Sequence, residues 1–110
     1  MARTIVRLSR EERAGLRYSF EKTLRRYPGA MVRLFGSRAK PGAGGDIDLL
    51  VSLARRPRGP LMLKVRLKQA IEDALGERKI DIVIAPPDAG AFVQMAKNEG
   101  IILWRNPRKS

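Results

Sequence analysis

The chain has 110 residues, of which 44% are hydrophobic, and a formal net charge of +12. This length suits one domain over residues 1–110, because two cores would each be too small to be stable. No apolar run is long enough for a membrane span or a signal peptide, so we expect a cytoplasmic protein without a membrane partner. The chain has neither cysteine nor histidine, which excludes disulfides and Ser-His-Asp or Cys-His catalysis and leaves only oxygen ligands for a metal, as for magnesium, manganese or calcium.

The first helix is predicted from a capping box, with Ser9 at the cap and Glu12 three residues later. Apolar side chains then recur at helical spacing up to Tyr27, and Pro28-Gly29 stops the run; they are Leu16, Phe20, Leu24 and Tyr27. Residues Ala30 to Phe35 are predicted to form a strand that ends at Gly36.

A second strand is predicted from Asp46 to Leu53, and a basic linker follows from Ala54 to Gly59. Pro60 suits the first turn of a helix and Gly76 its end. We expect this helix to bury one face, made of Leu63, Leu67, Ala70 and Ala74.

A third strand is predicted from Lys79 to Ala85, before Pro86-Pro87. Asp88 can cap a third helix that carries Phe92, Met95 and Ala96 and closes at Gly100, and Ile101 to Trp104 then form a final strand. Arg105 to Ser110 read as a frayed polar tail. The sequence therefore predicts an α+β fold with a sheet of about four strands and three helices packed on it.

Three aspartates occupy the polar phase of the second and third predicted strands. Ile47, Leu49 and Val51 share one face, as do Ile80, Ile82 and Ile84, whereas Asp46, Asp48 and Asp81 take the opposite phase. If these strands are neighbours, the three carboxylates converge at one sheet edge. Two like charges about 4 Å apart repel by roughly 4 kcal/mol at an effective dielectric near 20. Divalent cations remove this repulsion, and a pair of them can promote transfer of a nucleotide with release of pyrophosphate.

A glycine-rich loop precedes the aspartates and suits a polyphosphate. Gly36 permits a close approach of the backbone, Ser37 offers a hydroxyl and an amide N–H, and Arg38 or Lys40 can neutralise phosphate charge. Taken singly, each feature also fits ordinary turn chemistry, a flexible hairpin loop or the solvated side of a strand. Together they favour a site that holds a nucleoside triphosphate through metal ions.

The combination Gly36-Ser37, Asp46-Ile47-Asp48 and Ile80-Asp81-Ile82 resembles the minimal nucleotidyltransferases of the DNA polymerase beta superfamily. The resemblance implies a polymerase-beta-like fold with a mixed sheet, two Mg²⁺ or Mn²⁺ ions on Asp46, Asp48 and Asp81, and an ATP triphosphate on Gly36 and Ser37. It also implies an antitoxin that transfers AMP to a hydroxyl of a HEPN-type toxin encoded by a neighbouring gene. One departure is the loop from Arg38 to Gly45, whose eight residues make it shorter than is common in that family.

Other functions stay open at this point. A member of this family can neutralise its partner by binding alone, without turnover. A non-catalytic module could instead hold an acidic partner through Arg55, Arg56 and Arg58. An RNA-binding protein is disfavoured, because only 5% of the residues are aromatic and the basic residues are scattered along the chain. Nucleic acid is therefore not expected to be the main partner.

Overall fold

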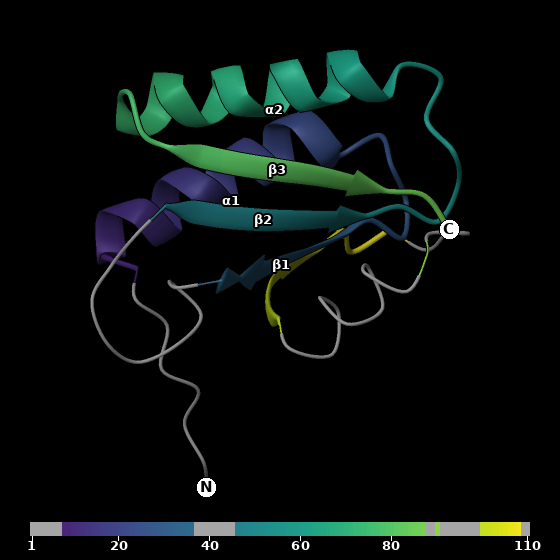
Figure 1. The fold of residues 1–110 in the computed structure, drawn as a ribbon, viewed down its shortest axis with the longest axis horizontal. Helices are drawn as coiled ribbons and strands as arrows, with labels where there is room; N and C mark the ends of the chain where they lie inside the picture. Colours follow the sequence, from purple (N-terminus) through teal and green to yellow (C-terminus); the bar gives the residue numbers. More distant parts are fainter. Residues whose placement is uncertain (1–7, 37–45, 88–89, 91–99, 109–110) are drawn as a thin grey trace, which may run out of the picture.

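The computed structural model describes residues 8–36, 46–87, 90 and 100–108. In these residues two helices pack on a mixed sheet of four strands, in the order β3-β2-β1-β4 (Figure 1). The elements are α1 (Arg10–Leu24), β1 (Met31–Phe35), β2 (Ile47–Ser52), α2 (Pro60–Leu75), β3 (Ile80–Ala85) and β4 (Ile101–Arg105). The predicted α+β class and all four predicted strands are confirmed.

Helix α1 begins at the predicted capping box. The Ser9 hydroxyl accepts a hydrogen bond from the Glu12 amide at 3.0 Å, and the Glu12 carboxylate accepts one from the Ser9 amide at 2.9 Å. Glu12 is itself buried, and its second oxygen lies 3.5 Å from a guanidinium nitrogen of Arg78, which precedes β3. The cap therefore ties the start of α1 to the segment that leads into β3.

Helix α2 has the predicted limits but a slightly different buried face. Leu63, Leu67, Ala70 and Ile71 are buried, whereas Ala74 is exposed. The expectation for Ala74 was wrong because Leu75 fills the space between the two helices there. A methyl group on Gly15 of α1 would come within 2.5 Å of a Leu75 methyl carbon, which shows how closely the two helices approach at this point.

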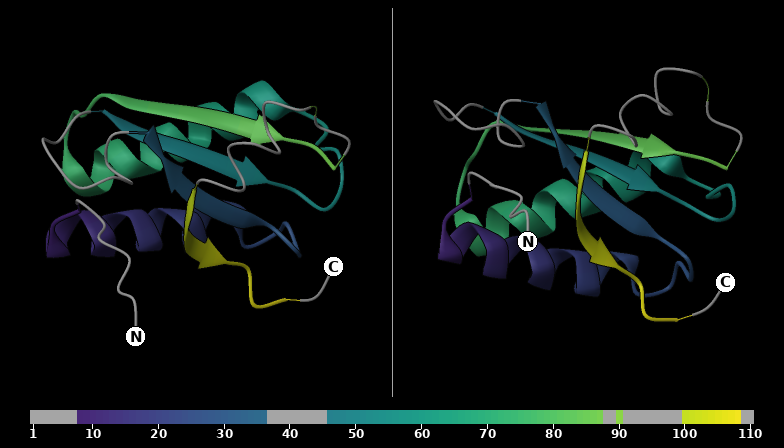
Figure 2. Two further views of the ribbon diagram at one scale, coloured as in Figure 1. Left: turned by 60° about the horizontal axis from the view of Figure 1, so that its bottom comes forward. Right: turned by 90° about the horizontal axis from the view of Figure 1, so that it is seen from below.

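Both helices cover the same face of the sheet (Figures 1 and 2). Strand β1 pairs antiparallel with β2 and β4, and β2 pairs parallel with β3. The core lies between the sheet and the helices and joins fully buried side chains from all layers, among them Leu16, Phe20, Leu34, Leu49, Val51 and Leu67. Asp48 and Asp81 belong to the other phase of their strands, as predicted.

Two predictions at the C-terminal end need correction or restriction. The described residues contain two helices where the sequence predicted three, and the expected third helix after Asp88 falls on 88–89 and 91–99, outside the described residues. The frayed tail was wrong for its first part, since Arg105 belongs to β4 and Asn106 is buried.

The Asn106 side chain explains this order, because it caps the last turn of α1. Its amide nitrogen donates to the carbonyl oxygens of Leu24, Arg25 and Tyr27 at 3.0, 3.2 and 2.8 Å. Its amide oxygen accepts from the Arg108 amide at 2.9 Å. The carbonyls of Leu24 and Tyr27 also accept from the amides of Tyr27 and Ala30, each at 3.0 Å, so the Asn106 amide adds a second donor to them and serves the Arg25 carbonyl beside them.

No helix in the part of the chain that the structure describes is both long enough and apolar enough to cross a membrane.

Candidate active site

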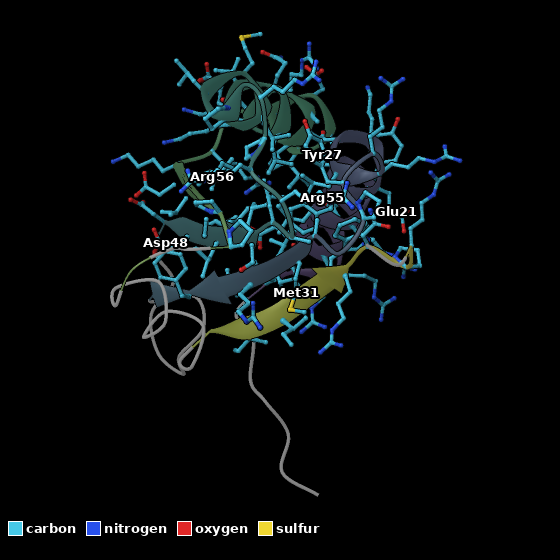
Figure 3. The ribbon with its side chains drawn as sticks, turned by 90° about the vertical axis from the view of Figure 1, so that its right-hand side faces the viewer. Glu21, Tyr27, Met31, Asp48, Arg55 and Arg56 are labelled. Carbon is cyan, nitrogen blue, oxygen red and sulfur yellow. The ribbon has the colours of Figure 1, made fainter. Side chains whose placement is uncertain are left out.

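The parallel pairing of β2 and β3 places Asp48 directly beside Asp81. These two residues are register partners at the start of the strands. The Ile47 amide donates to the Lys79 carbonyl at 3.1 Å, and at the far end the Leu53 amide donates to the Ala85 carbonyl at 2.9 Å, so the register is held at both ends. The helix-facing isoleucines and leucines fix which face each aspartate takes, because a slip of one residue would bury the carboxylates. Figure 3 shows Asp48 at the margin of the sheet, away from α2.

The surroundings of Asp48 disfavour its ionised form. Burial raises the pKa of the Asp48 carboxyl, and the negative charges of Asp81 and Asp46 raise this pKa further. Asp81 also forms a side-chain hydrogen bond with Asp48, which raises the same pKa. Such a bond requires a proton on one of the two carboxyl groups. Within the part of the chain that the structure describes, the ionised form of Asp48 is therefore disfavoured, and a divalent cation would offset this.

Gly36 lies against the Asp48 carboxylate. Its backbone has φ of +75°, a conformation that side chains rarely adopt. A Cβ atom built on Gly36 would run into the outer carboxylate oxygen of Asp48 and would lie 3.2 Å from its carboxyl carbon. Glycine at this position therefore lets the turn after β1 pass directly beside Asp48. The approach of this turn to a phosphate stays a prediction.

Asp46 stands apart from this pair. It precedes β2 and is exposed, and it acts on Asp48 through its charge. Among the residues that the structure describes, no group of three or more acidic side chains is placed to hold a metal ion together. The structure thus brings Asp48 and Asp81 together and does not gather all three carboxylates into one ligand set. The donors are nevertheless all carboxylate oxygens, which suit magnesium or manganese.

The remaining predicted phosphate-binding residues, Ser37, Arg38 and Lys40, lie outside the described residues. Their proposed roles stay predictions.

Arg33 is a residue of this face that the sequence analysis missed. It pairs with Leu50 in the sheet, two residues from the Phe35–Asp48 pair on one side and two from the Met31–Ser52 pair on the other, so all three pairs share one face. Its guanidinium donates to the Ser52 hydroxyl over 3.4 Å. The alternation of β1 could have identified it, because Val32 and Leu34 are apolar and Arg33 is the charged residue of the opposite phase.

A comparison with protein families gives a match over most of the chain. Residues 20–109 match the family described as polymerase beta, nucleotidyltransferase, and this range includes Gly36 and all three aspartates. The chain belongs to the polymerase beta nucleotidyltransferase family. No curated protein matches the chain in a sequence search.

Membership of the polymerase beta nucleotidyltransferase family agrees with the geometry. The matched range spans every strand and α2, together with the last turn of α1. It therefore contains the whole face on which Asp48, Asp81 and Gly36 meet. At this general level the family indicates nucleotidyl transfer.

Proposed function

We propose that this protein is a magnesium-dependent nucleotidyltransferase that moves AMP from ATP to a hydroxyl group of a protein. The acceptor we propose is a HEPN-type toxin encoded by a neighbouring gene, which the transfer would silence, so that the chain acts as its antitoxin. Family membership supports nucleotidyl transfer in general. The acceptor, the nucleotide and the metal come from the resemblance of the motifs.

The observation that carries the proposal is the register pair Asp48–Asp81 beside Gly36. A solvated strand edge needs no such arrangement, and the raised pKa of Asp48 shows that the fold bears a cost for it. A carboxyl group whose ionised form is disfavoured and which lies beside a glycine turn fits a site whose charge is completed by ligands.

The proposed division of roles follows the positions of the side chains. Asp48 and Asp81 would hold the metal, with Asp46 as the third carboxylate if it moves toward them, and the backbone at Gly36 would approach the triphosphate. The bound metal would supply positive charge for the phosphate oxygens and the leaving pyrophosphate. In the reaction the acceptor oxygen bonds to the α-phosphorus, the bond to pyrophosphate breaks, and the hydroxyl proton leaves. Asp81, the more exposed of the pair, is the carboxylate that would accept this proton.

The direct test mixes the protein with the product of its neighbouring gene, Mg²⁺ and ATP labelled on either the α- or the γ-phosphate. Intact-mass spectrometry and radiography of the separated proteins follow the label. We expect α-label, and no γ-label, on the partner, together with a mass increase of one or more AMP units. Label from γ-labelled ATP would indicate a kinase reaction and would contradict the proposal.

Three variants assign the site. Asp48→Asn and Asp81→Asn should abolish transfer, whereas Asp73→Asn, an exposed carboxylate on α2, should leave it unchanged. A partner that is neutralised equally well by wild type and by both site variants, with no label on it, would instead support neutralisation by binding alone.

A further inference from the structure

The outer face of α2 exposes apolar side chains that the core does not use. Leu61, Met62 and Val65 are 71%, 55% and 50% exposed. Leu61 and Val65 are four residues apart and Met62 and Val65 three, so the three side chains are neighbours on the helix surface. A single exposed leucine is ordinary on a protein surface, but three adjacent ones form a patch. We call Leu61, Met62 and Val65 the α2 patch.

Basic residues surround the α2 patch. Lys64 and Lys68, one turn apart, flank it on one side, Arg66 flanks it on the other, and all three are exposed. Residues 54–71 contain six basic residues and no acidic one, a formal charge of +6 and thus half of the net +12 of the chain. Part of the positive charge of the chain is therefore gathered in the segment before α2 and in the first turns of that helix.

A groove extends the basic surface toward α1. It has a volume of about 370 Å³ and runs along Arg66 of α2 beside Lys22 of α1 and Arg26, which follows that helix. Asp73 also lines the groove and brings a negative charge to its end, where the carboxylate accepts a hydrogen bond from Gln69 at 2.8 Å. The basic border of the patch thus continues across the gap between the helices.

The α2 patch is remote from the paired aspartates. Helix α2 packs on one face of the sheet, and Asp48 and Asp81 lie on the other (Figures 1 and 3). The first turn of α2 lies near the ends of β2 and β3, whereas the two aspartates lie at the starts of these strands. A molecule bound to the outer face of α2 would leave the carboxylates accessible.

We propose that the α2 patch docks another protein, through a surface with an apolar centre and carboxylates on both sides of it. Protein interfaces combine an apolar centre with a polar rim and favour methionine and arginine, as found here. A second copy of this chain does not fit, because basic rims would face each other. A membrane is disfavoured since the widest apolar face of α2, with Leu63 and Leu67, is buried in the core. Nucleic acid is disfavoured because the patch offers aliphatic side chains and no aromatic ring for stacking.

The test uses a defined probe, a fluorescein-labelled helical peptide with leucines at i, i+4 and i+7 and glutamates on both sides of that stripe. Fluorescence anisotropy measures its binding to the full chain. We expect saturable binding that weakens as salt rises, because salt screens the charges of the rim. Two control peptides, one with serine for leucine and one with lysine for glutamate, should bind at least about tenfold more weakly.

Variants then locate the bound peptide. Changing Leu61, Met62 and Val65 together to serine should weaken binding by about tenfold or more, as loss of a central apolar cluster does. The matched control changes Tyr18 and Ile102 to serine; these side chains are 58% and 42% exposed on other elements, and their loss should have no effect.

Charge reversal supplies a second pair of variants. Lys64→Glu, Arg66→Glu and Lys68→Glu together should abolish binding, whereas the same reversal at Arg10, Arg13 and Arg25, exposed on or just after α1, should weaken it only slightly. Circular dichroism checks that each variant is folded, which surface changes should preserve.

Three results would overturn the proposal. The first is the absence of peptide binding to the wild-type chain. The second is binding that survives the triple serine change. The third is tighter binding of phosphatidylglycerol vesicles or of a single-stranded RNA that depends on the same residues. None of these results bears on label transfer by the aspartates, so this proposal and the catalytic one fail separately.

Discussion

Replacing Gly36 with alanine tests the close approach between the turn after β1 and Asp48. An alanine at φ of +75° costs roughly 1–2 kcal/mol of stability from the backbone alone. Its methyl group would also run into the Asp48 carboxylate. Overpacking costs about 1–3 kcal/mol, and we take the lower end because the contacted oxygen is at the end of a side chain that can turn aside. We therefore expect Gly36→Ala to lose about 2–3 kcal/mol.

The assay is urea unfolding followed by the fluorescence of Trp104, the single tryptophan, without metal or nucleotide. The matched comparison is Gly36→Ala in an Asp48→Ala background, where the nearest remaining Asp48 atom, Cβ, is at an ordinary contact distance of 3.5 Å. There the cost should fall by about 1 kcal/mol, a coupling that a double-mutant cycle resolves. Gly76→Ala, at φ of +82° and ψ of −179° with no atom within 4 Å of the added Cβ, gives the cost of a backbone that almost only glycine adopts, without a contact.

An equal cost of Gly36→Ala in both backgrounds would refute the close approach, and with it the argument that glycine is required beside the paired aspartates. The stability cost of Gly36→Ala could fall in the Asp48→Ala background while Gly36→Ala still binds nucleotide. This result would confirm the contact but show that nucleotide binding does not depend on it.

Three further predictions concern individual side chains. Asp48→Asn should stabilise the metal-free protein at pH 7. Folding raises the pKa of the Asp48 carboxyl, so its ionisation destabilises the folded state as the pH rises above the ordinary pKa of 3.8, and the gain in stability from Asn should vanish below that pH. An equal gain at pH 3 and at pH 7 in urea unfolding would contradict this. Asn106→Ala should cost roughly 2 kcal/mol, because the carbonyls of Leu24, Arg25 and Tyr27 each lose the side-chain amide as a donor and the buried site loses its polar contacts; thermal unfolding measures it, and a cost near zero would mean that water replaces the amide. Ser9→Ala should cost about 1 kcal/mol in the same assay, and an unchanged melting temperature would show that the capping box contributes nothing.

The sequence predicted the fold and the paired aspartates well, for identifiable reasons. Period-two alternation in β2 and β3 fixed the faces of Asp48 and Asp81, and capping chemistry fixed the start of α1. It could not predict that Asn106 would cap α1, because that contact joins residues 82 positions apart and leaves no local signal. The sequence analysis missed Arg33, because a single arginine in a short strand points to a site only when the neighbouring strand places an aspartate on the same face.

The buried face of α2 shows a different limit. Helical spacing places both Ile71 and Ala74 toward that face, but only Ile71 is buried, and the side chain that lies beside Gly15 near the end of the helix is Leu75. The prediction that Asp46 joins the other two aspartates could not be made safely from the sequence, because it depends on the side-chain positions just before β2. Alternation places it in the right phase, but the structure leaves it exposed and outside any ready-made ligand set.

The central claim is that Asp48 and Asp81 bind the metal that carries the nucleotide. Isothermal titration of Mn²⁺ in the presence of a non-hydrolysable ATP analogue, into wild type and into the Asp48→Asn, Asp81→Asn and Asp73→Asn variants, tests it most directly. Wild type and Asp73→Asn should bind alike, and each site variant should bind at least about tenfold more weakly, since each loses a carboxylate ligand. Equal affinity in all four proteins would contradict the claim.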